Sequence, residues 1–175
     1  MNEPVPITAR FVLIDQDGAS VTEVSYAGKY LLVFFGFTNC RVVCPRALRR
    51  LTRVLDRLGA DARYVQPLYI SVDPVRDTPD RLRQFLRDYH RNIRGCTGTA
   101  VQVDAAKHAF HVFAERKEDA LDPDGYSVPH TAITYLLGPD GKYITHFLDS
   151  VREEELFEQI QSRITCDHAM SREQK

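Results

Sequence analysis

The sequence YLLVFFGFTNCRVVCP, residues 30–45, contains the features on which the fold and the chemistry of this protein depend. The segment from Tyr30 to Phe37 is almost continuously apolar and aromatic, which predicts a strand buried on both faces of a sheet. Cys40 and Cys44 follow, and Pro45 suits the first turn of a helix because no backbone donor is needed there. The stretch therefore predicts a buried strand, a short loop with two thiols, and a helix.

The helix after this loop has an amphipathic pattern. Leucines recur at helical spacing, and the arginines between them should form a solvated face. The leucines are Leu48, Leu51, Leu55 and Leu58, and the arginines are Arg46, Arg49, Arg50, Arg53 and Arg57. Cys44 would lie at the helix N-terminus, where the macrodipole should stabilise its thiolate, and Arg41 adds a cation beside Cys40. Both sulfurs are therefore candidate nucleophiles or soft-metal ligands.

Length and charge favour one domain without a nucleic-acid or membrane partner. A chain of 175 residues can bury roughly 70% of its unfolded surface. The 23 basic and 24 acidic residues are interspersed, and four cysteines are too few for a disulfide scaffold. No stretch has the apolar length of a membrane span, and Met1 to Arg10 lacks the regions of a signal peptide. The chain as written is expected to be a soluble monomer without an export signal.

The remaining pattern predicts a single domain at residues 11–164, between a flexible lead-in at 1–10 and a frayed tail at 165–175. Asp17-Gly18 between two short apolar runs predicts an N-terminal β-hairpin, and Thr78 and Thr99 should cap helices. Further strands are expected at residues 65–72, 111–115, 131–137 and 143–148, a last helix at 152–164, and a loop around Gly95 and Gly98. This order predicts an α/β, thioredoxin-like fold, with a central mixed sheet flanked by helices and the hairpin at one edge.

The spacing of Cys40 and Cys44 becomes informative only through its place in the fold. Nearby cysteines are often no more than small buried hydrophobes. Here both follow a buried strand and precede a helix, and open α/β sheets carry their sites at the carboxyl ends of such strands. A redox disulfide, a peroxidatic cysteine and a soft-metal site all remain open. A disulfide across so short a loop would stabilise the fold by only about 2 kcal/mol, so it would act as a switch.

His130 is the third candidate residue, because the strand that it precedes should lie beside the strand that precedes Cys40. A single histidine at such a position is more often a surface residue than a ligand. Two thiolates and an imidazole nevertheless suit Cu(I), and with a further oxygen ligand they can hold Cu(II). Zinc would require a fourth protein ligand, which the sequence does not offer. Thioredoxin-type enzymes have two residues between their cysteines, and this chain has three; peroxiredoxin-type sites place threonine where this chain has Phe37.

Several motifs, taken in order, resemble the Sco/SenC family of copper chaperones for cytochrome c oxidase assembly. They are Cys40 to Pro45 after an aromatic strand, Ser71 to Pro74 with Arg76-Asp77-Thr78, Thr97-Gly98-Thr99, His130-Thr131, and Tyr135 to Gly141. The resemblance covers residues 11–164 and implies a thioredoxin-like fold.

The resemblance also implies a function and partners. One copper ion would be bound by Cys40, Cys44 and His130. The protein would deliver copper to the binuclear copper site of cytochrome c oxidase subunit II, or keep the cysteines of that site reduced. A copper donor or a thiol reductant would be a second partner, and the family implies the periplasmic face of the inner membrane. A thiol-disulfide oxidoreductase or redox sensor that uses the same cysteine pair is the alternative.

Two positions depart from the family pattern. Arg41 stands where the family commonly has proline or a small residue, and Pro129 stands where it commonly has an acidic residue. The added cation and the missing carboxylate should disfavour Cu(II) and leave His130 without one hydrogen-bond partner.

The other metal-capable residues carry weaker predictions. Asp73 and Asp77 could orient the site or simply form a turn and a helix cap, and His108 and His111 are expected to be a solvated pair. Cys96 is expected to be a buried free thiol in a loop. In the tail, Cys166 and His168 are expected to be incidental, with an accessory copper-capture site as the alternative.

Overall fold

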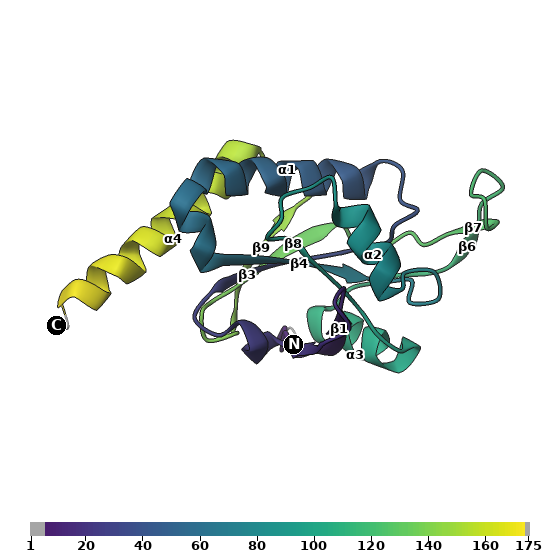
Figure 1. Cartoon of the computed structure of the whole chain (residues 1–175), viewed down its shortest axis with the longest axis horizontal. Coiled ribbons are helices and arrows are strands. Elements are labelled where there is room, and N and C mark those ends of the chain that lie inside the picture. Colours follow the sequence, from purple (N-terminus) through teal and green to yellow (C-terminus); the bar gives the residue numbers. More distant parts are fainter. Residues whose placement is uncertain (1–5, 174–175) are drawn as a thin grey trace, which may run out of the picture.

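The computed structural model describes residues 6–173, and its centre is a seven-stranded mixed sheet in the order β2-β1-β5-β4-β3-β8-β9 (Figure 1). The strands are β1 Val12–Asp15, β2 Ser20–Thr22, β3 Tyr30–Gly36, β4 Val65–Ser71, β5 Arg94–Thr97, β8 Ile133–Leu137 and β9 Tyr143–Leu148. β3, β4 and β5 run parallel, and the other neighbours are antiparallel. The thioredoxin-like mixed sheet is confirmed, with the β1–β2 hairpin at one edge.

Helices cover both faces of this sheet. They are α1 Val43–Leu58, α2 Pro79–Leu86, α3 Ala100–Phe110 and α4 Glu153–Glu173. α1, α2 and α4 share one apolar core, and α3 packs into a second core on the opposite face (Figure 1). Thr78 and Thr99 accept the backbone N–H groups of Arg81 and Gln102, so both predicted helix caps are confirmed. A separate two-stranded ribbon, β6 Lys117–Glu118 with β7 Tyr126–Ser127, lies beside the main sheet.

Two elements differ from the prediction. β5 occupies the segment that was predicted to be a loop, and it pairs with both β1 and β4. The sequence does not predict this strand because glycine disfavours strands. A Cβ at Gly95 would lie 2.9 Å from side-chain atoms of Leu82 and Leu86, so glycine is the residue that lets α2 pack on the strand. The strand predicted at residues 111–115 is reduced to one bridge between Ala114 and His130.

The predicted loose ends are also partly ordered. Ala9 is fully buried and donates its N–H to the carbonyl of Ala109, whereas residues 1–5 lie outside the described part of the chain. At the other end, α4 continues through the segment that was predicted to fray from residue 165. The hydroxyl of Tyr30 donates to Asp167, and this tertiary contact helps to hold the added helical turns. No helix within residues 6–173 is long and apolar enough to cross a bilayer.

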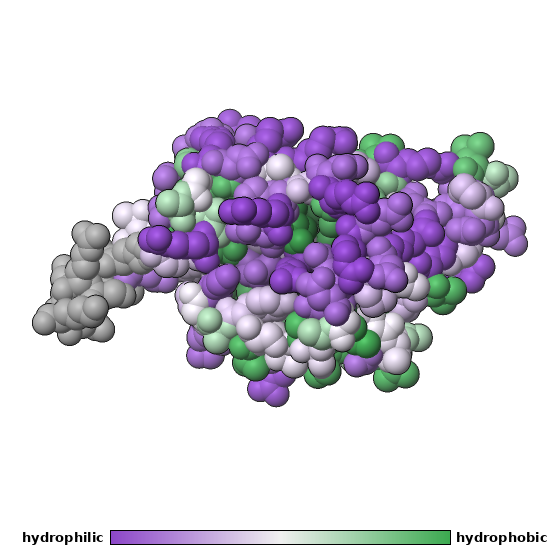
Figure 2. Space-filling model, viewed as in Figure 1, coloured by the Kyte–Doolittle hydropathy of each residue, from purple (hydrophilic) through white to green (hydrophobic). Residues whose placement is uncertain are grey.

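The arginine face of α1 is paired rather than simply solvated. Its arginines meet carboxylates at and just before the start of α4 in the pairs Arg46–Asp149, Arg53–Glu153 and Arg57–Glu154. The surface over α1 is accordingly largely hydrophilic in Figure 2. Because these pairs are partly exposed, each contributes about 0–1 kcal/mol, and the apolar face of α1 supplies most of its packing energy.

Candidate metal centre

The loop between β3 and α1 places Cys40 against the start of the helix. Its sulfur accepts the backbone N–H of Cys44, with 3.4 Å between N and Sγ. The N-cap residue Val42 makes no side-chain capping bond, so the sulfur satisfies one of the N–H groups that a helix N-terminus leaves free. Cys40 is half-buried and Cys44 is fully buried, and both are free thiols.

The two thiols have opposite protonation preferences. The pKa of Cys40 is lowered to about 5, first by the hydrogen bond from the Cys44 thiol and then by backbone N–H groups of residues 42–44, against the opposing effect of burial. The pKa of Cys44 is raised by that same hydrogen bond and by burial. The prediction that the helix N-terminus stabilises a thiolate at Cys44 is therefore wrong: the negative charge is favoured on Cys40, which accepts the hydrogen bond from the Cys44 thiol and those from backbone N–H groups.

Arg41 does not stabilise the Cys40 thiolate as the sequence suggested. Its guanidinium pairs with Asp119, with 2.9 Å between Nη2 and the carboxylate, and donates to the carbonyl of Leu121 at 2.8 Å. The charge of Arg41 is thus balanced by a neighbouring segment. The prediction that this cation disfavours Cu(II) loses its electrostatic basis.

His130 is held with one ring nitrogen toward Cys44. Its Nδ1–H donates to the carbonyl of Val128 at 2.9 Å, and its ring meets the ring of Phe37 edge to face, with centroids 5.7 Å apart. Because Nδ1 carries the proton in this arrangement, Nε2 keeps its lone pair and lies 4.0 Å from Cys44 Sγ. Because Pro129 replaces an acidic residue, His130 was expected to lack one hydrogen-bond partner. The Val128 carbonyl takes that place.

The structure therefore brings together Cys40, Cys44 and His130 at the carboxyl end of β3. A pocket of about 420 Å³ opens beside them, and its walls come mainly from residues 37–43 and 127–132. Among the described side chains, those of residues 6–167, no three His, Cys, Asp or Glu are already arranged as a metal cluster. Uptake of an ion by these three residues consequently requires side-chain rotation. The donor set of two sulfurs and one imidazole suits a soft, low-coordinate metal ion.

A buried arginine, which the sequence showed only as part of a motif, supports one wall of the pocket, the wall to which Asp119 and Asp122 belong. Arg76 follows β4, and its side chain is only 7% exposed. It pairs with Asp73 and with Asp122, and its guanidinium lies 3.7 Å from the ring centroid of Tyr126. Asn39, next to Cys40, donates to the same Asp122 carboxylate. One ionic network thereby joins the cysteine loop to residues 118–126.

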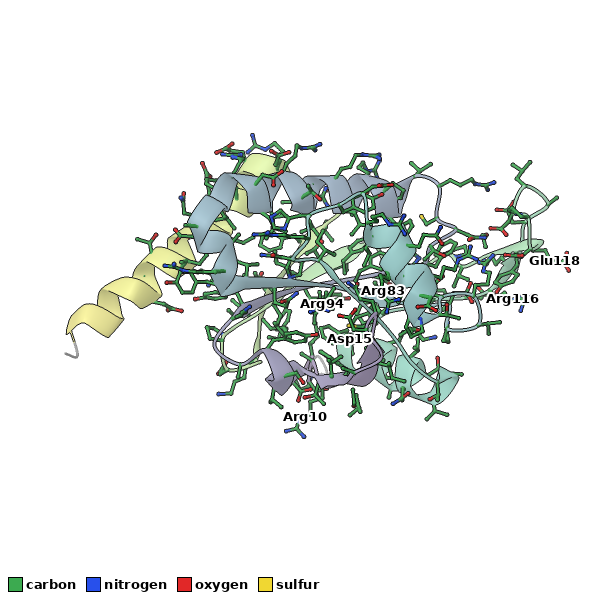
Figure 3. The ribbon with its side chains drawn as sticks, in the orientation of Figure 1. Arg10, Asp15, Arg83, Arg94, Arg116 and Glu118 are labelled. Atoms are coloured by element: carbon green, nitrogen blue, oxygen red, sulfur yellow. The ribbon has the colours of Figure 1, made fainter. Side chains whose placement is uncertain are left out.

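The region around β6 is visible in Figure 3, where Arg116, just before β6, and Glu118, on β6, are labelled. The guanidinium of Arg116 lies 3.5 Å from the ring centroid of Tyr126, on which Arg76 also packs. Two cations therefore contact one aromatic ring, and the nearby carboxylates offset their repulsion.

Asp77 orients the cysteine loop and is not the helix cap, which is Thr78. The carboxylate of Asp77 accepts the Thr38 N–H at 3.1 Å, the Thr38 hydroxyl at 2.6 Å and the Ser71 hydroxyl at 2.7 Å. Burial raises the pKa of Asp77 even though these bonds act in the opposite direction. Of the two alternatives left open by the sequence, orientation is thus the better description for Asp77, and Asp73 serves the Arg76 network.

A family model described as SCO1/SenC matches residues 1–165. The chain belongs to the SCO1/SenC family. The SCO2-like protein of Rickettsia felis is 36% identical over 151 residues, which cover 86% of this chain and 74% of that protein. The structure of Bradyrhizobium japonicum ScoI with copper bound superposes with a TM-score of 0.81 at 35% identity, over 89% of this chain and 98% of that chain.

A third similar protein has been described as carrying a disulfide switch. BsSco, described as having a disulfide switch and as a member of the Sco family of cytochrome c oxidase assembly proteins, superposes with a TM-score of 0.70 at 26% identity, over 94% of this chain and 98% of that chain. These similarities confirm the resemblance that the ordered motifs indicated.

Four other metal-capable residues of this SCO1/SenC chain do not line the pocket: Cys96, His108, His111 and Cys166. Cys96 is buried within β5, so the predicted buried free thiol is confirmed, but in a strand rather than a loop. His108 and His111 are exposed at the end of α3, where His111 adopts a left-handed conformation with φ 55° as the C-cap. Cys166 is exposed on α4, whose C-terminal part lies at the opposite end of the molecule from β6 and β7 (Figure 1). The side chain of His168 lies outside the described residues.

Proposed function

We propose that this protein is a copper metallochaperone that binds one copper ion through Cys40, Cys44 and His130 and acts in cytochrome c oxidase assembly. Its task would be to deliver copper to the binuclear copper site of subunit II, or to maintain the thiols of that site. The observation that carries the proposal is the approach of His130 Nε2 to Cys44 Sγ, 4.0 Å apart, beside a Cys40 of lowered pKa. Family membership and the copper-bound structure of B. japonicum ScoI support it.

The two thiols would take different parts in metal uptake. Cys40 is a thiolate at neutral pH and lines the pocket, so it is suited to be the first ligand of an incoming Cu(I). Cys44 is a buried thiol that must lose its proton before it can bind as the second ligand, so uptake releases a proton to solvent. His130 would supply the third ligand through Nε2, since its Nδ1–H is held by the Val128 carbonyl.

Delivery would reverse this order through the open pocket. Ligands of the acceptor can approach from the side on which Cys40 is half-exposed, and copper can pass by stepwise exchange of one ligand at a time. The ion pairs of Arg76 with Asp73 and Asp122 would keep the wall that contains Asp122 in place during this exchange.

Thiol-disulfide exchange by Cys40 and Cys44 is a second candidate function. A low-pKa thiolate next to a protonated thiol is the arrangement of an attacking and a resolving cysteine. The disulfide switch described for BsSco supports this candidate. Maintenance of the thiols of subunit II would use this chemistry.

An anaerobic copper titration of the reduced protein separates these functions. We expect wild type to retain one copper ion and His130→Ala to bind Cu(II) far more weakly, with little change in the Cys40–Cys44 reduction potential, because His130 is a ligand and not a thiol. Exposed His111 provides the control, and His111→Ala should behave as wild type. Metal stoichiometry and the thiolate-to-Cu(II) charge-transfer absorption are the measurements. Absence of tightly held copper, together with a readily reversible disulfide, would assign thiol-redox function instead.

A further inference from the structure

The phenol of Tyr69 presents an unexplained buried polar atom beside the metal centre. Tyr69 lies in β4 and is fully buried. Its hydroxyl makes no hydrogen bond of normal geometry among the described residues, although it lies close enough to the Cys44 thiol to lower the pKa of that thiol, against the larger opposing effects of Cys40 and burial. A buried hydroxyl without a partner destabilises a folded protein, whereas phenylalanine would fill the same ring volume without that cost.

Gly36 shows what this hydroxyl faces. A Cβ built at this last residue of β3 would lie 2.5 Å from the Tyr69 hydroxyl oxygen and 2.7 Å from Cys44 Sγ. One methyl group would therefore collide with both atoms, and the absence of a side chain at Gly36 gives them a shared space behind the cysteine loop. This is a close approach for which the sheet needs glycine.

The ring of Tyr69 is fixed in this position by its neighbours. It stacks on Phe34 with centroids 6.2 Å apart and packs against Phe85 with centroids 5.6 Å apart. Since the ring cannot swing toward solvent, the hydroxyl stays beside the Cys44 sulfur whether or not that sulfur offers a good acceptor.

We propose that Tyr69 is a positioning residue whose hydroxyl donates a hydrogen bond to the Cys44 sulfur when that sulfur becomes a metal-bound thiolate. The inference rests on the proposed function. A protonated thiol is a weak acceptor, and a thiolate accepts much more strongly. Metal loading would thus turn a poor contact between the Tyr69 hydroxyl and the Cys44 thiol into a full hydrogen bond.

The hydrogen bond also has a consequence for the oxidation state. A donor at a ligand sulfur withdraws electron density from it, and hydrogen bonding around the cysteine sulfur tunes the potential of copper-thiolate sites. Weaker donation from sulfur favours Cu(I) over Cu(II). Tyr69 would therefore bias the site toward the reduced ion.

The variant Tyr69→Phe tests the proposal, with Tyr135→Phe as the matched control. Tyr135 is 2% exposed in β8 and belongs to the other apolar core, so its substitution also removes one buried phenol hydroxyl. For Tyr69→Phe we expect an unchanged or higher Tm of the metal-free protein, about tenfold weaker Cu(I) binding, and a shift of the Cu(II) charge-transfer absorption to longer wavelength. Tyr135→Phe should leave copper affinity and the absorption unchanged.

Two results would overturn this role. Unchanged affinity and absorption in Tyr69→Phe would make the hydroxyl a packing atom only. A joint fall of metal-free Tm and copper affinity would make Tyr69 a structural residue.

If the proposed copper-binding function is wrong, the wild-type protein itself will retain no copper, which distinguishes this outcome from an effect of Tyr69→Phe. The same variants are then titrated with Cd(II), a soft ion whose thiolate absorption reports on the cysteines. A shift confined to Tyr69→Phe would uphold the hydrogen bond, and no shift would overturn it.

Discussion

Cys44 and Cys96 are both fully buried thiols, but they differ in what surrounds them. Cys96 lies in the middle of the sheet, in register with Asp15 of β1 and Ile70 of β4, and burial raises its pKa to about 12. Cys44 lies in the first turn of α1, next to Cys40 and His130. Burial suppresses the reactivity of both sulfurs, and only the neighbouring donors make one of them a candidate ligand.

The surroundings of the two thiols also differ in access. The region of Cys96 is closed by paired strands, and its charged neighbours Asp15 and Arg94, labelled in Figure 3, interact at 3.9 Å. The region of Cys44 adjoins the pocket through Cys40. A thiol in the first turn of a helix beside the pocket can thus reach an incoming ion after a side-chain rotation, whereas a thiol in the middle of a sheet cannot.

The largest difference between the two buried thiols is expected in the number of copper ions that each serine variant retains. Cys44→Ser should abolish stoichiometric copper binding, because it leaves one thiolate and one imidazole. Cys96→Ser should retain one copper ion per chain, since its hydroxyl replaces a thiol remote from the pocket. Copper per protein after anaerobic gel filtration measures both. Retention of copper by Cys44→Ser would move the site to the C-terminal helix, where Cys166 is exposed.

A second prediction concerns the stability of the polar region around the pocket. Arg76→Met leaves Asp73 and Asp122 without their buried cation and should lower the free energy of unfolding by about 3–5 kcal/mol. Urea unfolding of the metal-free protein measures the change. The control is Arg83→Met, which breaks the half-exposed pair with Asp80 and should lower stability by less than about 1 kcal/mol. Similar small losses in both variants would mean that the network does not act as a buried unit.

The smallest expected effect is in the pH dependence of alkylation. Since the pKa of Cys40 is lowered to about 5, its thiolate population is already full at pH 7. Its reaction rate with iodoacetamide should rise up to about pH 6 and then change less than about twofold between pH 7 and 9. Cys96 should stay unmodified over this range in the folded protein. Peptide mass spectrometry distinguishes the sites, and a steady tenfold rise per pH unit at Cys40 would show that it is protonated at neutral pH.

Much of the architecture was predictable because its signals are local. The apolar run from Tyr30, the leucine spacing of α1 and the threonine caps act over a few residues, and each formed the element that it predicted. β5 was missed because Gly95 has no strand signal of its own, and its pairing depends on β1 and β4. The continuation of α4 was missed for the same reason, since Asp167 meets Tyr30 only in the folded chain.

From the sequence alone came the four helices, most strands of the main sheet and their order, the family, and Cys40, Cys44 and His130 as candidate ligands. Periodicity, turn residues and motif spacing carry that information along the chain. The folded structure was needed to show that the negative charge is favoured on Cys40, and that the buried hydroxyl of Tyr69 faces the other sulfur. The physical reason is that protonation and hydrogen bonding depend on atoms a few ångströms apart, which here come from β3, β4, α1 and the segment before β8.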